Sequence, residues 1–305
     1  MTRNLTNEKK DMIFRENMEL LRIIHEFGGG LMLRQQVIAF AQEVLGKSEA
    51  QIQRMLKNLE NTGFISATKL FHNCNNKVII LGNYAASRFS GQTSRNCWVS
   101  DCSQNNKLYL TFRAEFILEM IKEKKNAVNY YRDSPLLITK NNASALYKWF
   151  AERVPVTPAF LYDQDIEMGL YKRRNVYGEQ DFDRFSFKSL LHSNYLLHGI
   201  FGQEKKTIEF IYINSHCVAT NKFYHSIYCL LFMLGKYTDL KFDKINVVIA
   251  FFSKDELNAF KKNWNQRYDG RLVNERQIRY DITSACNILF HSLDLDMKYS
   301  LCRDL

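Results

Sequence analysis

The sequence predicts a mixed architecture, α+β at the N-terminal end and α/β at the C-terminal end, and three observations support it. A chain of 305 residues favours about two domains. Its 46% hydrophobic and 13% aromatic residues are sufficient for packed cores. Apolar residues recur first at helical spacing and later in alternating helix and strand patterns. We expect domains at residues 1–84 and 181–305, joined by a linker and helical middle segment at 85–180.

The chain has a formal net charge of +10, from 42 Lys+Arg and 32 Asp+Glu. Residues 1–100 contain 13 Lys+Arg and 8 Asp+Glu, so half of the positive excess lies there. This excess makes nucleic acid the first partner to consider. Because no long block of one sign exists, an unstructured basic arm is not expected.

Hydropathy and cysteine usage favour a cytoplasmic protein. The longest apolar run tested, Ile227–Leu234, has about eight residues, whereas a spanning helix needs roughly 20. Residues Met1–Asp11 are polar and charged, unlike a secretory signal. The seven cysteines are scattered, and Cys97 and Cys102 lack a second pair or a nearby His. We therefore expect reduced thiols, no metal, no cofactor and no membrane partner.

Three short helices and a hairpin are predicted in the first domain. Met18–Phe27 and Arg34–Leu45 show helical apolar spacing, and Ser48 is a good N-cap for a third helix that ends near residue 61. Phe64–Leu70 and Lys77–Leu81 read as two strands around an Asn-rich turn. This order of elements is typical of a winged helix-turn-helix.

The third helix has the side chains that major-groove recognition requires. Arg pairs with guanine, Gln and Asn pair with adenine, and Lys binds phosphate. We expect base contacts from Gln51, Arg54 and Asn58. The full predicted DNA-binding set is Lys47, Ser48, Gln51, Arg54, Lys57, Asn58, Lys69, Asn75 and Lys77. Two alternatives remain open, namely a winged helix that binds another protein and a helical bundle with an ordinary solvated face.

The middle segment is less informative. Gly82–Lys107 is polar and is expected to be a loop or linker. Helices are expected at Phe112–Lys125 and Ala143–Val154. The acidic residues Asp163, Asp165 and Glu167 lack the glycine and the final glutamate of a calcium loop, so calcium binding is not expected. Lys172–Arg174, just beyond, are interpreted either as phosphate contacts or as a solvated charged turn.

Helices and strands alternate in the last domain, which indicates an α/β layer with a parallel or mixed sheet. The expected elements are a helix at Ser186–Phe201, a strand at Thr207–Ile213, a helix at Phe223–Tyr237, a strand at Ile245–Phe252, a Ser253-capped helix at Lys254–Trp264, a strand at Gln277–Ile282 and a helix at Ser284–Leu293. His192 and His198 would then lie on different faces of one helix, which favours structural roles for both.

The order of these parts resembles the replication-relaxation proteins of plasmids and integrative elements. The wing ends in VIILGNYAASRFSG, and an LxHxxxLxxxI-like pattern follows at Leu190–Ile200. A Glu-bearing strand then occupies Ile208–Tyr212, and the next helix ends at Tyr237. The resemblance covers most of the chain except about 85–180, and it rests on order and pattern with few shared motif residues.

The resemblance implies a DNA-binding winged helix joined to a degenerate restriction-endonuclease-like core. Such a core, where active, needs an Asp and a (Glu/Asp)-x-Lys motif to bind a divalent metal. Glu209 is followed two positions later by Ile211, and Asp181 and Asp183 have no evident Lys partner. We therefore expect a non-enzymatic, sequence-specific protein of a mobile genetic element that binds double-stranded DNA, as a homodimer, in transcription or replication control. A metal-dependent nuclease that uses Glu209, and a regulator whose C-terminal domain binds a peptide or protein, are the alternatives.

Overall fold

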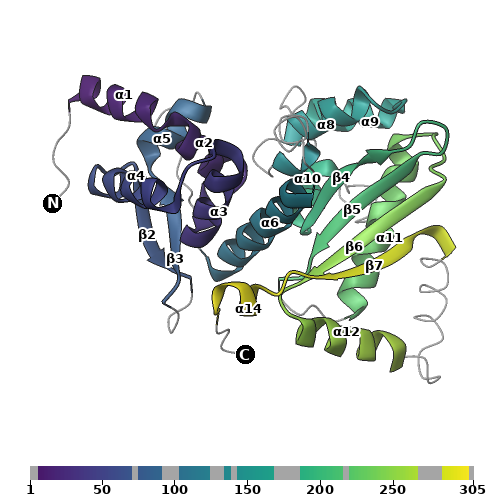
Figure 1. Ribbon diagram of the computed structural model, residues 1–305. Coiled ribbons are helices and arrows are strands. Elements are labelled where there is room, and N and C mark those ends of the chain that lie inside the picture. The colour runs from purple at the N-terminus through teal and green to yellow at the C-terminus, as the bar shows by residue number, and fades with distance from the viewer. Residues whose placement is uncertain are drawn as a thin grey trace. The chain divides into compact units, whose positions relative to one another are not determined.

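The computed structural model describes residues 6–70, 75–90, 103–123, 134–138, 143–167, 186–215, 220–266 and 284–301. It has a mixed α+β fold with two sheets and divides into two compact units (Figure 1). Unit 1 comprises Met1–Asp133 and Leu293–Leu305, and unit 2 comprises Ser134–Ser292, so the units do not coincide with the three segments expected from the sequence. No helix within the described ranges is both long and apolar enough to cross a bilayer.

Unit 1 combines helices with a small antiparallel sheet. Its elements are α1 (Asn7–Glu16), α2 (Met18–Glu26), β1 (Leu31–Leu33), α3 (Arg34–Leu45), α4 (Glu49–Asn61), β2 (Ile65–Lys69), β3 (Lys77–Leu81), α5 (Asn83–Ser90), α6 (Gln104–Glu123) and α14 (Leu295–Tyr299). The strand order is β1-β3-β2, with both pairs antiparallel. Helix α3 and strand β3 have the bounds expected from the sequence. The three-residue strand β1 is too short to be recognised from periodicity.

A buried arginine forms hydrogen bonds to backbone carbonyls in the core of unit 1. Phe27, just after α2, stacks on Phe40 of α3 with ring centroids 4.6 Å apart. The fully buried guanidinium of Arg113 donates hydrogen bonds to the carbonyls of Phe27 at 2.5 Å and Glu26 at 3.2 Å. These carbonyls lie at the end of α2, where no helical N–H groups remain to satisfy them. Burial lowers the pKa of Arg113 to about 10.

The expected linker at 82–107 is wrong at both of its ends. Asn83–Ser90 forms α5, where Phe89 stacks on His25 with ring centroids 4.9 Å apart. Helix α6 starts at Gln104, eight residues before the predicted start at Phe112. The prediction of a loop rested on polar composition. Packing of one helix face against a neighbouring element can stabilise a helix even where its residues have a weak intrinsic helix propensity. Residues 91–102 lie outside the described ranges.

Unit 2 contains a four-stranded mixed sheet. Its elements are the 3₁₀ turn η1 (Pro135–Leu137), α8 (Ala143–Ala151), α9 (Pro158–Glu167), α10 (Phe187–His192), β4 (Tyr195–Phe201), β5 (Thr207–Ile213), α11 (Thr220–Tyr237), β6 (Lys244–Phe251), α12 (Lys254–Gln266) and β7 (Asn287–Ser292). The order is β4-β5-β6-β7. β4 and β5 are antiparallel, whereas β5, β6 and β7 are parallel and are connected through α11 and α12 (Figure 1).

Aromatic rings attach α11 and α12 to one face of this sheet. Phe223 of α11 packs on Tyr212 of β5 with ring centroids 5.1 Å apart. Phe260 of α12 lies 5.2 Å from Phe251 of β6 and 6.1 Å from Phe290 of β7. The register pairs Tyr212 with Ile249 and Ile249 with Phe290, so these residues point to one side of the sheet. Phe251 points to the same side, because it lies two residues after Ile249 on the same strand.

Two expected helices of unit 2 contain strands. Ser186–Phe201 was expected to be one helix, but α10 ends at His192 and β4 begins at Tyr195. Asn194, with φ 65°, adopts the left-handed conformation that ends the helix. The predicted helix Ser284–Leu293 is wrong in the same way, because Asn287–Ser292 pairs with β6 as strand β7. The expected strand Gln277–Ile282 lies outside the described residues.

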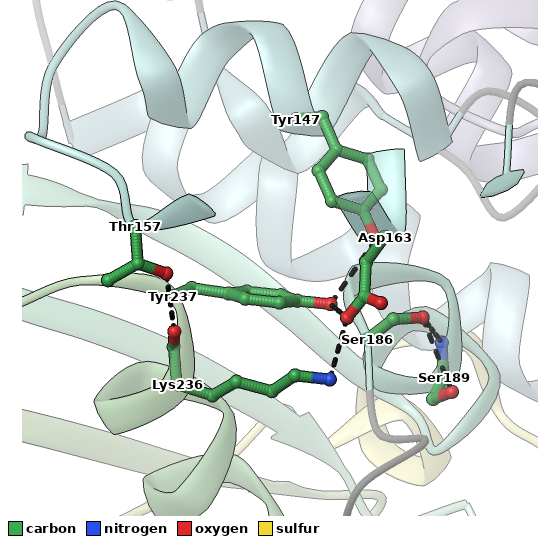
Figure 2. A network of polar contacts seen from close by, with 7 residues as sticks. All are labelled: Tyr147, Thr157, Asp163, Ser186, Ser189, Lys236 and Tyr237. Atoms are coloured by element: carbon green, nitrogen blue, oxygen red, sulfur yellow. Dashed lines mark hydrogen bonds and ion pairs between the residues drawn. The ribbon is translucent and has the colours of Figure 1, made fainter. Parts of the chain in front are cut away.

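Helix α9 is fixed to the end of α11 by a buried polar network (Figure 2). Asp163 accepts hydrogen bonds from the ammonium of Lys236 and the hydroxyl of Tyr237, both at 2.8 Å. The Tyr237 hydroxyl also lies 3.4 Å from that of Tyr147, and Thr157 donates to the carbonyl of Lys236 at 2.6 Å. Burial is the main reason why the pKa of Tyr237 is raised. Asp163 therefore belongs to a structural network, whereas Lys172–Arg174 lie outside the described residues.

Candidate nucleic-acid interface

The start of α4 is fixed by its own first residues. The hydroxyl of Ser48 accepts the backbone N–H of Gln51 at 3.4 Å. In return, the Ser48 N–H donates to the Gln51 side-chain oxygen at 3.0 Å. This reciprocal arrangement is a capping box, which satisfies two N–H groups at the helix start. Ser48 therefore has a demonstrated structural role, and the Gln51 oxygen is occupied by the cap.

Helix α3 determines which face of α4 points outward. The Arg34 guanidinium donates two hydrogen bonds to the Gln53 side-chain oxygen, at 3.1 and 2.8 Å. It also forms an ion pair with Glu60 at 3.7 Å. On the apolar side, Ile52 and Leu56 are fully buried. These contacts turn one glutamine and one carboxylate of α4 toward α3, and the face opposite Ile52 and Leu56 is left to other residues.

That opposite face is basic and amide-rich. Arg54, Lys57 and Asn58 are all exposed, and Lys57 and Asn58 lie three and four residues after Arg54, which places them on one helix face. Within the described part of the chain, their side chains form no hydrogen bond or ion pair. Lys47, just before the cap, is exposed as well. The three central residues are therefore available for an external partner, whereas Gln51 would first have to leave the capping box.

The hairpin β2–β3 presents a second group of cations. Its register places Lys69 directly opposite Lys77, and both are exposed. Like charges in directly opposed positions destabilise a strand pair unless an anion lies near. Asn75 is also exposed, and residues 71–74 of the turn lie outside the described part of the chain.

Lys107 adds a third cation that the sequence analysis did not identify. Its ammonium donates to the backbone carbonyl of Lys69 at 3.4 Å, so it lies against the end of β2. The residue was assigned to the expected linker, and the sequence gives no sign that the start of α6 packs beside the hairpin. Lys107 thus lies beside the hairpin that carries Lys69 and Lys77, while the side chain of Asn76 in the same hairpin donates to a backbone carbonyl of α14.

The other candidate site centres on Glu209 in unit 2. One carboxylate oxygen lies 2.5 Å from Nδ1 of His198, and the other accepts from Asn246 at 3.2 Å. Asn287 donates to Asn246 at 3.1 Å, so a polar row crosses all four strands. His198 lies at a β-bulge of β4 and not on the expected helix. Glu209 therefore lies on an inner strand and pairs with His198 and Asn246.

The surroundings of Glu209 differ from the metal site expected of an active core. Ile211, at the position of the motif lysine, is fully buried in the sheet. Among the described residues, no group of three His, Cys, Asp or Glu side chains could hold a metal ion. Asp181 and Asp183 lie outside the described residues. The arrangement is a row of mutually hydrogen-bonded polar side chains that runs from the buried His198 to the exposed Asn287.

Comparison of the chain with protein-family models, curated proteins and solved structures finds no match.

Proposed function

We propose that this chain is a sequence-specific double-stranded DNA-binding protein, in which unit 1 acts as a winged helix-turn-helix. Helix α4 would enter the major groove, and the hairpin β2–β3 would act as the wing. The observation that supports this most is the exposed face of α4, where Arg54, Lys57 and Asn58 have no partner within the described residues. Major-groove recognition uses these residue types on one helix face.

The position of Lys69, Lys77 and Lys107 on and beside the hairpin supports the same proposal. Lysines bind DNA phosphates, and phosphate contacts orient a protein on the duplex without reading its sequence. We further propose that the protein binds as a homodimer and controls replication or transcription of a mobile genetic element. This wider role rests on the resemblance to replication-relaxation proteins.

The nuclease alternative has less support. Both oxygens of Glu209 are engaged by protein side chains, and a buried isoleucine occupies the position of the motif lysine. The restriction-endonuclease-like character of unit 2 therefore remains a proposal that rests on the resemblance alone.

Two alanine variants on α4 test the assignment. In fluorescence anisotropy with a duplex selected by the wild type, Arg54→Ala should lose roughly 1–3 kcal/mol at one base pair and tolerate changes there. Lys57→Ala should weaken binding to all sequences alike. Lys188→Ala, an exposed cation of unit 2, is the matched control and should bind normally. Wild-type affinity and specificity in the Arg54 variant would refute the proposed recognition face.

A further inference from the structure

The last described segment of the chain packs into unit 1 although it follows the strand that ends unit 2. Leu293 and Leu295 are fully buried, and Leu301 is nearly so. The short helix α14 is bounded by Asp294 and Ser300, both in the left-handed conformation. Non-glycine residues adopt this conformation at an energetic cost, so the surrounding contacts must hold the segment in place.

The strongest of these contacts surround the buried carboxylate of Glu115 on α6, whose side chain is only 4% exposed. The Tyr299 hydroxyl donates to it at 2.6 Å, Gln36 at 3.0 Å and the Lys298 ammonium at 3.2 Å. Lys298 also pairs with Glu119. A buried carboxylate requires such donors, since an unsatisfied one is strongly destabilising. Helix α14 supplies two of the three.

The same segment reaches the hairpin. The side-chain amide of Asn76 donates to the backbone carbonyl of Tyr299 at 2.7 Å. The carbonyl of Asn76 in turn accepts the backbone N–H of Leu70 at 3.1 Å, which closes the hairpin beyond β2 and β3. Asn76 lies between Asn75 and Lys77, both of which belong to the predicted DNA-binding set. Helix α14 therefore contacts the hairpin at the position where DNA binding is proposed.

We infer that Leu293–Leu301 is a strap that fixes the wing in its DNA-binding position and thereby sets DNA affinity. This inference rests on the proposed function. A wing that is already ordered loses less conformational entropy when it binds, so the strap increases affinity without touching DNA. Tyr299 and Asn76 are positioning residues in this scheme.

The test compares the full-length wild type with Tyr299→Phe, Asn76→Ala and the double variant. Tyr299→Phe removes one hydroxyl and keeps the ring, and Tyr162→Phe, an exposed tyrosine of unit 2, is its matched control. Hydrogen exchange of the amides in residues 65–81 is measured without DNA, and the affinity for a selected duplex is measured separately. Circular dichroism and thermal unfolding establish that each variant is folded.

If the strap fixes the wing, both single variants should raise the rate of amide hydrogen exchange in the hairpin and weaken DNA binding by roughly threefold to tenfold. The double variant should fall short of the product of the two effects, because both residues act through one element. Unchanged exchange in folded variants would overturn the strap whatever the DNA result. Faster exchange with unchanged affinity would overturn its role in DNA binding. A wild type that binds no DNA would instead reject the proposed function, and exchange alone would then decide whether the strap holds the hairpin.

Discussion

At the residue scale, the side chains that build α4 differ from those that its exposed face offers to a partner. Ser48 and Gln51 satisfy the start of the helix, and Gln53 and Glu60 attach it to Arg34. The sequence predicted the cap at Ser48 correctly. It could not distinguish Gln51 from Arg54 as a candidate base contact, because both are polar and exposed. Only the hydrogen bonds of the capping box separate their roles.

Ser48→Ala should therefore reduce stability. Loss of an N-cap side chain typically costs about 1 kcal/mol, and here it also removes one half of a capping box. The free energy of unfolding, measured in urea, should fall by about that amount in the transition that includes unit 1. Ser66→Ala, at an exposed position of β2, is the control and should leave the value unchanged. Equal stability of the two variants would contradict the structural role of Ser48.

His25 gives unit 1 a pH dependence whose sign can be predicted. Its burial, more than any other cause, lowers the pKa of His25 below the ordinary value of 6.5. The folded state therefore favours the neutral ring, and the associated stability is complete above pH 6.5 and lost as the pH falls below it. Urea unfolding at pH 7.5 and 5.5 should show this loss in the wild type, and His25→Gln should reduce it. An identical pH dependence in both proteins would contradict the assignment.

At the scale of elements, the predictions that succeeded depend on strong local signals. Ser253 accepts the backbone N–H of Glu256 at 3.2 Å and caps α12, as expected. Strand β5 has the predicted bounds because its β-branched and aromatic residues are bordered by polar residues on both sides. The sequence YLLHGIF of β4 fits either a helix or a strand by apolar spacing. Pairing with β5 decided between them, and such non-local pairing is not visible in local sequence.

The wing element can be tested through Lys107. If its ammonium contacts a phosphate, Lys107→Gln should reduce the slope of log affinity against log salt concentration by about one. Lys122→Gln is the control, since this exposed lysine lies on the same helix roughly 22 Å away, at 1.5 Å per residue. Equal slopes for the wild type and the Lys107 variant would show that Lys107 does not contact a DNA phosphate.

At the scale of the whole molecule, the sequence predicted the mixed α+β class and a mixed sheet, and both are confirmed. It did not predict that the chain returns to unit 1 after β7. This return depends on Tyr299 and Lys298 reaching Glu115, more than 170 residues away in sequence. A hydroxyl, an ammonium and a carboxylate so far apart leave no periodic signal. The candidate recognition face was predicted because it lies on one helix, whereas Lys107 and the strap depend on tertiary contacts.

The central claim is sequence-specific binding of double-stranded DNA, and selection from a random duplex pool tests it most directly. The full-length protein is incubated with the pool at physiological salt, and the bound fraction is amplified and sequenced over several rounds. We expect enrichment of one motif, with two inverted half-sites if the protein binds as a homodimer. The Arg54→Ala protein should enrich a motif with one position relaxed. The absence of any enriched sequence, at low as well as physiological salt, would contradict the claim and favour a winged helix that binds another protein.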